Sequence, residues 1–157
     1  MSTVDTLAKD FLSQKRIAVA GVSRSGEDAA NLIYRRLKST GHQVFPVNPN
    51  TEAFEGDPCY PDLKSIPGGV DGVVIVTRPE VTDQIVRQCI EVGVSKVWMH
   101  QSMMMAGTSV SEKAVAYCHE NDISVIAGAC PLMFGETADF GHKCMKFVLR
   151  VAGRMPK

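Results

Sequence analysis

The chain has 157 residues, 45% of them hydrophobic and 22% charged, so it is long enough for one domain with a continuous core. Its 17 basic and 17 acidic side chains cancel, which excludes the broad positive field that attracts nucleic acids or anionic membranes. The first residues lack a basic segment followed by a long apolar run. We therefore predict a cytoplasmic protein with no membrane association and no nucleic-acid partner.

Short apolar runs rich in β-branched residues alternate along the chain with helical patterns. We predict strands at 16–20, 43–47, 72–77, 96–99 and 124–127, each short enough to be buried on both faces. Amphipathic helical spacing occurs between most of these runs. This alternation predicts the α/β class: one doubly wound Rossmann-like domain with a five-stranded parallel sheet in the order 3-2-1-4-5.

Apolar residues at helical spacing also occur near both ends of the chain. We expect an N-terminal helix and a C-terminal helix, the latter over about residues 138–153, to dock on the sheet. The C-terminal stripe consists of Phe140, Cys144, Phe147, Val148 and Val151. We predict a single domain over residues 1–157 with its core at about 10–130.

The first predicted strand leads into the glycine turn Gly21-Val22-Ser23-Arg24-Ser25-Gly26, which resembles part of a dinucleotide-binding motif. In a doubly wound sheet this turn lies where the strand order reverses, at the carboxyl ends of the strands. Backbone N–H groups and a helix N-terminus there favour an anion such as pyrophosphate. A plain turn that binds nothing is the alternative.

Two features argue against NAD as the ligand. Ser23 stands where the motif has the second glycine, which lets the pyrophosphate approach the backbone. The second predicted strand ends in Val47-Asn48-Pro49, without the acidic residue that binds a ribose 2′-hydroxyl. Arg24 still permits a ligand with an extra ribose phosphate, and charge alone does not choose between NADP and coenzyme A.

Several stretches together resemble the CoA-binding domain family, which is similar to the nucleotide-binding domain of the succinyl-CoA synthetase alpha subunit. The resemblance covers about residues 10–130. The matching stretches are AVAGVSR (18–24), LIYRRLKSTGHQVFPVNPN (32–50), GDPCYPDL (56–63), VDGVVIVTRPE (70–80) and KVWMHQS (96–102). The resemblance implies that the ligand is coenzyme A (CoA) or an acyl-CoA.

The same resemblance assigns ligand contacts to three segments. The glycine turn receives the CoA pyrophosphate, the end of the second strand borders the adenosine, and the end of the third strand faces the ligand from the other side. For Tyr60, packing over the core is the alternative to contact with the adenine. The implied residues are Gly21, Val22, Ser23, Arg24, Asn48, Pro49, Tyr60, Thr77, Arg78 and Pro79.

The chain departs from the family pattern after the fourth predicted strand. Relatives tend to continue with a Gln-Leu-Gly-like stretch, whereas this chain has Met99-His100-Gln101-Ser102 followed by Met103-Met104-Met105. The methionines fit an apolar channel for the pantetheine arm, and the alternatives are a flexible loop or a subunit contact. A homo-oligomer and an unidentified protein partner are both compatible with this pattern.

Catalytic chemistry is the competing interpretation. Cys130 follows the fifth predicted strand and is a candidate nucleophile with His142 as its base. We favour a small apolar cysteine at a strand end. The five cysteines show no paired spacing and are typical of reduced thiols. No metal site is predicted, because His142 and Cys144 point in different directions on a helix.

The sequence therefore predicts a module that binds coenzyme A or acyl-CoA noncovalently as a sensor, carrier or regulatory subunit. We expect a binding protein more than an enzyme. The alternatives are an NADP-dependent reductase, a thiol enzyme that uses Cys130, and a structural protein whose glycine turn is empty.

Overall fold

The computed structural model describes residues 3–24, 28–102, 107–135, 138 and 140–156. Predictions about Ser25, Gly26 and the three methionines at 103–105 fall outside these residues. Five strands form one parallel sheet: β1 (Arg16–Ala20), β2 (Gln43–Val47), β5 (Gly72–Ile75), β6 (Lys96–Met99) and β7 (Ser124–Ala127). The other elements are α1 (Val4–Leu12), α2 (Ala29–Ser39), the antiparallel pair β3 (Ala53–Phe54) and β4 (Asp57–Pro58), α3 (Pro79–Val92), α4 (Glu112–Glu120), the 3-10 helix η1 (Pro131–Met133) and α5 (Phe140–Val151).

The predicted α/β class with five parallel strands is confirmed, but the predicted strand order is wrong. The sheet runs β2-β1-β5-β6-β7, so the third predicted strand pairs with the first instead of the second. Pro46 explains the difference, because proline has no N–H and is confined to sheet edges. On the outer side of β2 the Tyr60 N–H donates to the Pro46 carbonyl oxygen at 2.9 Å. The order still reverses beside β1, so the glycine turn stays at the expected place.

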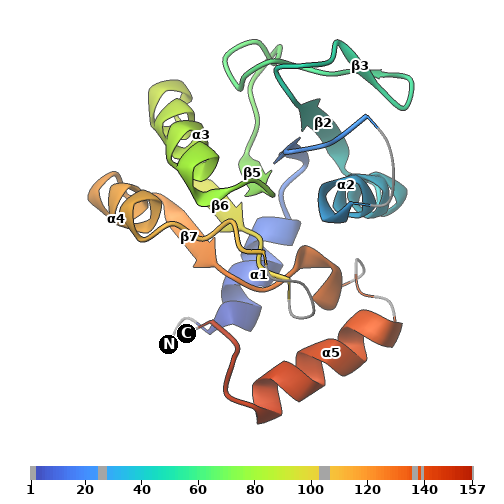
Figure 1. Cartoon of the computed structure of the whole chain (residues 1–157), viewed down its shortest axis with the longest axis vertical. Coiled ribbons are helices and arrows are strands. Elements are labelled where there is room, and N and C mark those ends of the chain that lie inside the picture. Colours follow the sequence, from blue (N-terminus) through green and yellow to red (C-terminus); the bar gives the residue numbers. More distant parts are fainter. Residues whose placement is uncertain (1–2, 25–27, 103–106, 136–137, 139, 157) are drawn as a thin grey trace.

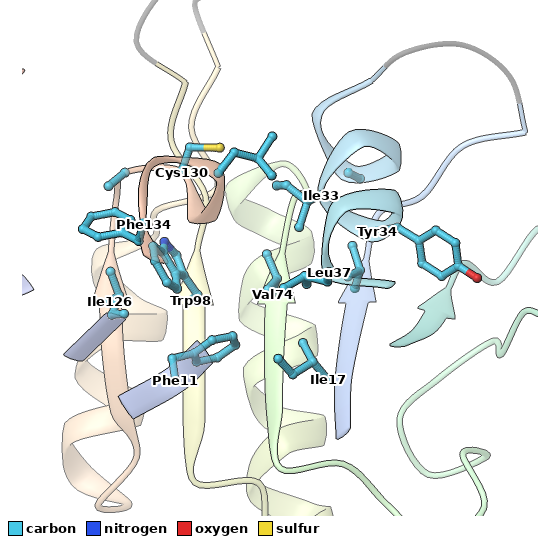
Figure 2. Close-up of a cluster of buried hydrophobic side chains, with 14 of the residues drawn as sticks. Phe11, Ile17, Ile33, Tyr34, Leu37, Val74, Trp98, Ile126, Cys130 and Phe134 are labelled. Atoms are coloured by element: carbon cyan, nitrogen blue, oxygen red, sulfur yellow. The ribbon is translucent and has the colours of Figure 1, made fainter. Parts of the chain in front are cut away.

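Helices cover both faces of the sheet (Figure 1). Alternate β1 residues point to opposite faces, so Ile17 packs with α1 and α2 while Ala18 packs with α3 and α4. On the first face the Trp98 ring lies edge-on to the rings of Phe11 and Phe134, with centroids 5.5 Å and 5.4 Å away (Figure 2). These contacts dock α1 and the segment after β7 on the sheet.

The C-terminal helix α5 docks through a different face from the one predicted. Leu149 is buried, and Lys146 and Arg150 each pair with Asp5 of α1 at 2.5 Å. These contacts hold the opposite side of the helix against the protein, so the apolar stripe faces away from the sheet. Exposed fractions are 68% for Phe147, 52% for Val148 and 73% for Val151, and Cys144 is also exposed.

The described α-helices have 9 to 14 residues, whereas a helix that spans a bilayer needs about 20. None of them has both the length and the apolar character needed to cross a membrane.

Candidate functional site

Gly21 begins the turn between β1 and α2 and is fixed by its neighbours. Its φ is +110°, and a Cβ atom at this position would overlap the carbonyl oxygen of Val76. The Gly21 N–H donates to the Val47 carbonyl oxygen at 3.1 Å, and the Val76 N–H donates to the Ala20 carbonyl oxygen at 2.9 Å. Only glycine fits here, and the turn is held between the ends of β2 and β5.

Asn31 fixes the middle of the turn from the first turns of α2. Its Oδ1 accepts the Ser23 N–H at 3.0 Å, and its Nδ2 donates to the Ser23 carbonyl oxygen at 3.2 Å. Asn31 is 1% exposed. The sequence analysis did not select this residue; its signal is a polar side chain between the buried apolar positions of an amphipathic helix. The Ser23 N–H is therefore committed to the protein rather than directed at a ligand.

Asn48 and Arg24 join the turn to the loop after β2. Asn48 Nδ2 donates to the Val22 carbonyl oxygen at 2.6 Å, and Asn48 Oδ1 accepts the Asn50 N–H at 2.7 Å. The Arg24 guanidinium donates to the Asn50 carbonyl oxygen. Beside them lies a depression of about 510 Å³, here called the Pro49 hollow, lined by Arg24, Pro49, Asn50, Thr51, Glu52, Cys59 and Pro61.

A second depression lies on the other side of the turn, at the carboxyl ends of β5 and β6. This β5–β6 cleft measures about 560 Å³ and has mostly apolar walls. The predicted residues Thr77, Arg78 and Pro79 lie in its wall, where Pro79 starts α3. Its lining is completed by Ala29, Val76, His100, Ser102, Gly107, Thr108 and Ser109.

Buried polar groups tie the cleft walls together. The Thr77 N–H donates to Ser109 Oγ at 2.9 Å, and Thr82 Oγ1 donates to the Ser109 carbonyl oxygen at 2.8 Å. Ser109 is 3% exposed, and the sequence analysis did not select it. Its hydroxyl connects the loop after β6 to the end of β5, although the two segments lie far apart in the sequence.

The charges around the turn both favour and oppose an anion. Arg24 and Arg78 are exposed cations beside the two depressions. The Ser23 hydroxyl donates to the carboxylate of Asp28, which caps α2 without a side-chain bond to the helix. An anion over the turn would take this hydroxyl from Asp28, and the arginines would offset the nearby carboxylate.

His100 is the buried titratable side chain of the cleft wall. It is 6% exposed. Burial lowers the pKa of the imidazole to about 4, with a smaller electrostatic contribution from His142. The imidazole is therefore uncharged at neutral pH.

Tyr60 and Cys130 lie outside the linings of these two depressions. The Tyr60 backbone extends the edge of β2, and its ring packs on Phe45 with centroids 6.2 Å apart. Cys130 is 7% exposed and belongs to the apolar cluster that contains Ile33 and Phe134 (Figure 2). Within the described ranges, no group of three or more His, Cys, Asp or Glu side chains could hold a metal ion.

Comparison with known proteins identifies the family. Residues 15–136 match the CoA binding domain family. The chain belongs to this family. The resemblance noted in the sequence is thereby confirmed, and the match includes both depressions and the turn between them.

Related proteins include one of similar size and several long ligases. The uncharacterized protein YneT of Bacillus subtilis is 27% identical over 123 residues, which are 78% of this chain and 87% of YneT. The ADP-forming acetate–CoA ligase II subunit alpha of Pyrococcus furiosus is 34% identical over 88 residues, which are 55% of this chain and 19% of that subunit. The chain thus spans only a small part of the ligase.

Solved structures give the same two groups. A hypothetical protein from Pyrococcus horikoshii OT3 is similar with a TM-score of 0.76 and 28% identity over 83% of this chain and 89% of its own. The dinucleotide-forming acetyl-coenzyme A synthetase 1 of Ca. Korarchaeum cryptofilum has a TM-score of 0.60 and 25% identity, covering 71% of this chain and 25% of that one. In both groups the similarity extends over most of the Rossmann-like domain.

Proposed function

We propose that this domain binds coenzyme A or an acyl-CoA noncovalently across the Gly21 turn. The observation that carries the proposal is the pair of depressions on the two sides of this turn. Each is lined by one exposed arginine, Arg24 in the first and Arg78 in the second. CoA consists of a nucleotide and a long pantetheine arm joined by a pyrophosphate. A ligand of this form places its anion at the turn and one part in each depression. Membership of the CoA binding domain family supports the same ligand.

In the proposed orientation the adenosine lies in the Pro49 hollow and the arm lies in the β5–β6 cleft. The Pro49 hollow is lined in part by Arg24, whose positive charge suits the extra phosphate on the CoA ribose. The cleft has mostly apolar walls, which suit an uncharged arm. Arg78, the N-cap residue of α3, is the second cation available to the pyrophosphate.

A binding role fits the remaining residues better than catalysis. The candidate nucleophile Cys130 is packed in an apolar cluster, where a thiol is inert unless the site opens. The relatives that are ligases share only part of their length with this chain, so we do not extend the ligase reaction to it. A sensor, carrier or regulatory subunit needs only the binding site.

Calorimetric titration of the purified, ligand-stripped protein tests the proposal. CoA, dephospho-CoA, NADP and NAD are compared in parallel. We expect CoA to bind most tightly and dephospho-CoA to bind more weakly, because dephospho-CoA lacks the phosphate that Arg24 would contact. Absence of binding by all four would overturn the proposal.

Two variants locate the ligand. Arg24→Ala is expected to weaken CoA binding about tenfold, the size of one charge-assisted hydrogen bond. Arg87→Ala is the matched control, because Arg87 is an exposed arginine of α3 that contacts Tyr117 outside both depressions. Equal effects of the two substitutions would place the ligand elsewhere.

A further inference from the structure

His100 is a buried residue whose imidazole makes no hydrogen bond with the described residues. The residue follows β6 and is 6% exposed. Its backbone N–H donates to the Ile75 carbonyl oxygen at 2.9 Å, and its carbonyl oxygen accepts the Ser109 N–H at 2.8 Å. In the described part of the chain, by contrast, no hydrogen bond reaches the ring nitrogens. Such a buried group calls for an explanation, because buried polar atoms are normally paired.

The unpaired ring atoms face the β5–β6 cleft. His100 lines this cleft. Over the described residues, every side-chain nitrogen or oxygen that is fully shielded has a hydrogen-bond partner. The unpaired nitrogens of His100 are therefore not fully shielded, and the β5–β6 cleft is the depression that this residue lines.

The hydroxyl groups of Thr77, Thr108 and Ser109 in this wall already have protein partners. Ser109 Oγ accepts the Thr77 N–H at 2.9 Å, Thr77 Oγ1 lies 3.0 Å from Thr82 Oγ1, and Thr108 Oγ1 accepts the Val110 N–H at 3.0 Å. Val76, Pro79 and Ala29 supply apolar surface. His100 is thus the buried side chain of the wall that still has hydrogen-bonding groups to offer a ligand.

The uncharged state of the imidazole limits what it can bind. A neutral imidazole carries one N–H donor and one acceptor nitrogen. It suits an uncharged carbonyl or amide group, and it offers no ion pair to a carboxylate. An acyl chain that ends in a carboxylate would have to lose its hydration in an apolar cleft, where the cation of the lining, Arg78, is exposed rather than buried beside His100.

We propose that His100 donates a hydrogen bond to the thioester carbonyl of a short, uncharged acyl group on CoA, so that the β5–β6 cleft is the acyl subsite. This inference rests on the proposed function, because it needs the arm of CoA to enter the cleft. It names the ligand class more narrowly: acetyl-type thioesters are preferred over free CoA and over dicarboxylic acyl-CoA thioesters.

Titrations of three proteins with three ligands test the inference. Wild type, His100→Gln and His100→Leu are titrated at pH 7.5 with CoA, acetyl-CoA and succinyl-CoA. We expect wild type to bind acetyl-CoA about fivefold more tightly than CoA, the size of one neutral hydrogen bond, and succinyl-CoA more weakly than acetyl-CoA. His100→Leu should bind CoA like wild type but lose the preference for acetyl-CoA. His100→Gln, with an amide N–H, should keep part of it.

A spectroscopic measurement on the unaltered protein gives a second test. With ¹⁵N-labelled histidine, acetyl-CoA is expected to shift the imidazole nitrogen resonances of His100, whereas CoA leaves them nearly unchanged. This measurement decides the matter even where His100→Leu does not fold.

The outcomes of these measurements distinguish failure of the proposed function from failure of the assignment of His100. If wild type binds no CoA compound, the proposed function fails. If it binds CoA and acetyl-CoA with equal affinity and no change at the His100 ring, only the assignment of His100 fails. A His100→Leu variant that weakens all three ligands equally would also overturn the assignment, because it would indicate a structural role.

Discussion

The two depressions beside the Gly21 turn are built in different ways. The Pro49 hollow lies next to the glycine turn and the loop after β2. The side chains of Asn48 and Arg24 join this turn and this loop by hydrogen bonds to backbone groups. The β5–β6 cleft has mostly apolar walls contributed by three segments far apart in the sequence, and they include the buried His100, whose ring makes no hydrogen bond with the described residues. The comparison teaches that one domain can place a depression lined by an exposed arginine and a mostly apolar depression on the two sides of one turn.

The largest expected effect comes from changing Gly21, the first residue of the turn between β1 and α2. Gly21→Ala places a Cβ against the Val76 carbonyl oxygen at a positive φ, so we expect a loss of at least about 3 kcal/mol or failure to fold. Urea unfolding monitored by the fluorescence of the single tryptophan, Trp98, measures the change.

Gly41→Ala is the matched control for that substitution. Gly41 also has a positive φ, +91°, but an added Cβ there meets no atom within 4 Å. We expect a loss of about 1 kcal/mol from backbone strain alone. Similar losses for the two variants would contradict the close approach of the turn to β5.

The next effect is a dependence of protein stability on pH, which comes from His100 in the wall of the cleft. The pKa of His100 is lowered to about 4 from an ordinary 6.5, so between these values the unfolded chain binds a proton that the folded protein does not. Stability should therefore fall as pH decreases through this window, by up to about 3 kcal/mol from this group. Unfolding midpoints measured from pH 7.5 to pH 4 test this, with Trp98 as the probe.

The variant His100→Gln should give a flatter pH profile in the same window. Asp5 and Asp57, whose carboxyl pKa values are lowered by hydrogen bonds to Lys146 and Lys38 respectively, lose their stabilising charge at lower pH. They therefore do not produce the slope above pH 4. An unchanged slope in His100→Gln would contradict the burial of this imidazole.

A smaller effect is expected on the side of the Pro49 hollow. Asn48→Ala removes the bonds to the Val22 carbonyl and the Asn50 N–H, so we expect a loss of about 1–2 kcal/mol and weaker CoA binding. Asn121→Ala is the control, because Asn121 Nδ2 donates to the Tyr117 carbonyl oxygen outside both depressions. Chemical unfolding and calorimetry measure both variants; an equal loss of affinity would show that the Asn48 side chain does not position the ligand.

The smallest effect is expected at Cys130, which lies outside the linings of both depressions. Cys130→Ser should leave the affinity for CoA within about twofold, because no ligand contact is removed. In wild type, iodoacetamide should modify the exposed Cys144 well before the buried Cys130, as mass spectrometry of peptides would measure. Rapid and selective alkylation of Cys130 would favour the thiol-enzyme alternative.

Much of this organisation could be predicted from the sequence because it depends on local chemistry. The strands are short β-branched runs, and the glycine turn follows the first of them directly. Asn48 and Pro49 follow the second strand, so both lie at the sheet edge where ligands bind. Pro46 also indicates that the second strand lies at an edge of the sheet, since proline favours edge strands. The predicted strand order did not take this proline into account.

The residues that the sequence did not reveal act through distant partners. Asn31 was overlooked because its bonds to Ser23 cross the turn between a strand and a helix. Ser109 and His100 were overlooked as site residues because the cleft exists only where β5, β6 and α3 meet. No local pattern marks such a residue, since a serine or histidine after a strand is equally common on an exposed loop.

The sequence by itself determined the fold class, the family and the place of the glycine turn, because periodicity, turn chemistry and motif order are local properties. The tertiary structure decided which apolar stripes are buried. The stripes of α1 and α5 look alike in the sequence, but ion pairs to Asp5 and the burial of Leu149 fix α5 with its stripe outward. Tertiary structure also decided that His100 is uncharged, because only burial removes the water that stabilises the imidazolium ion.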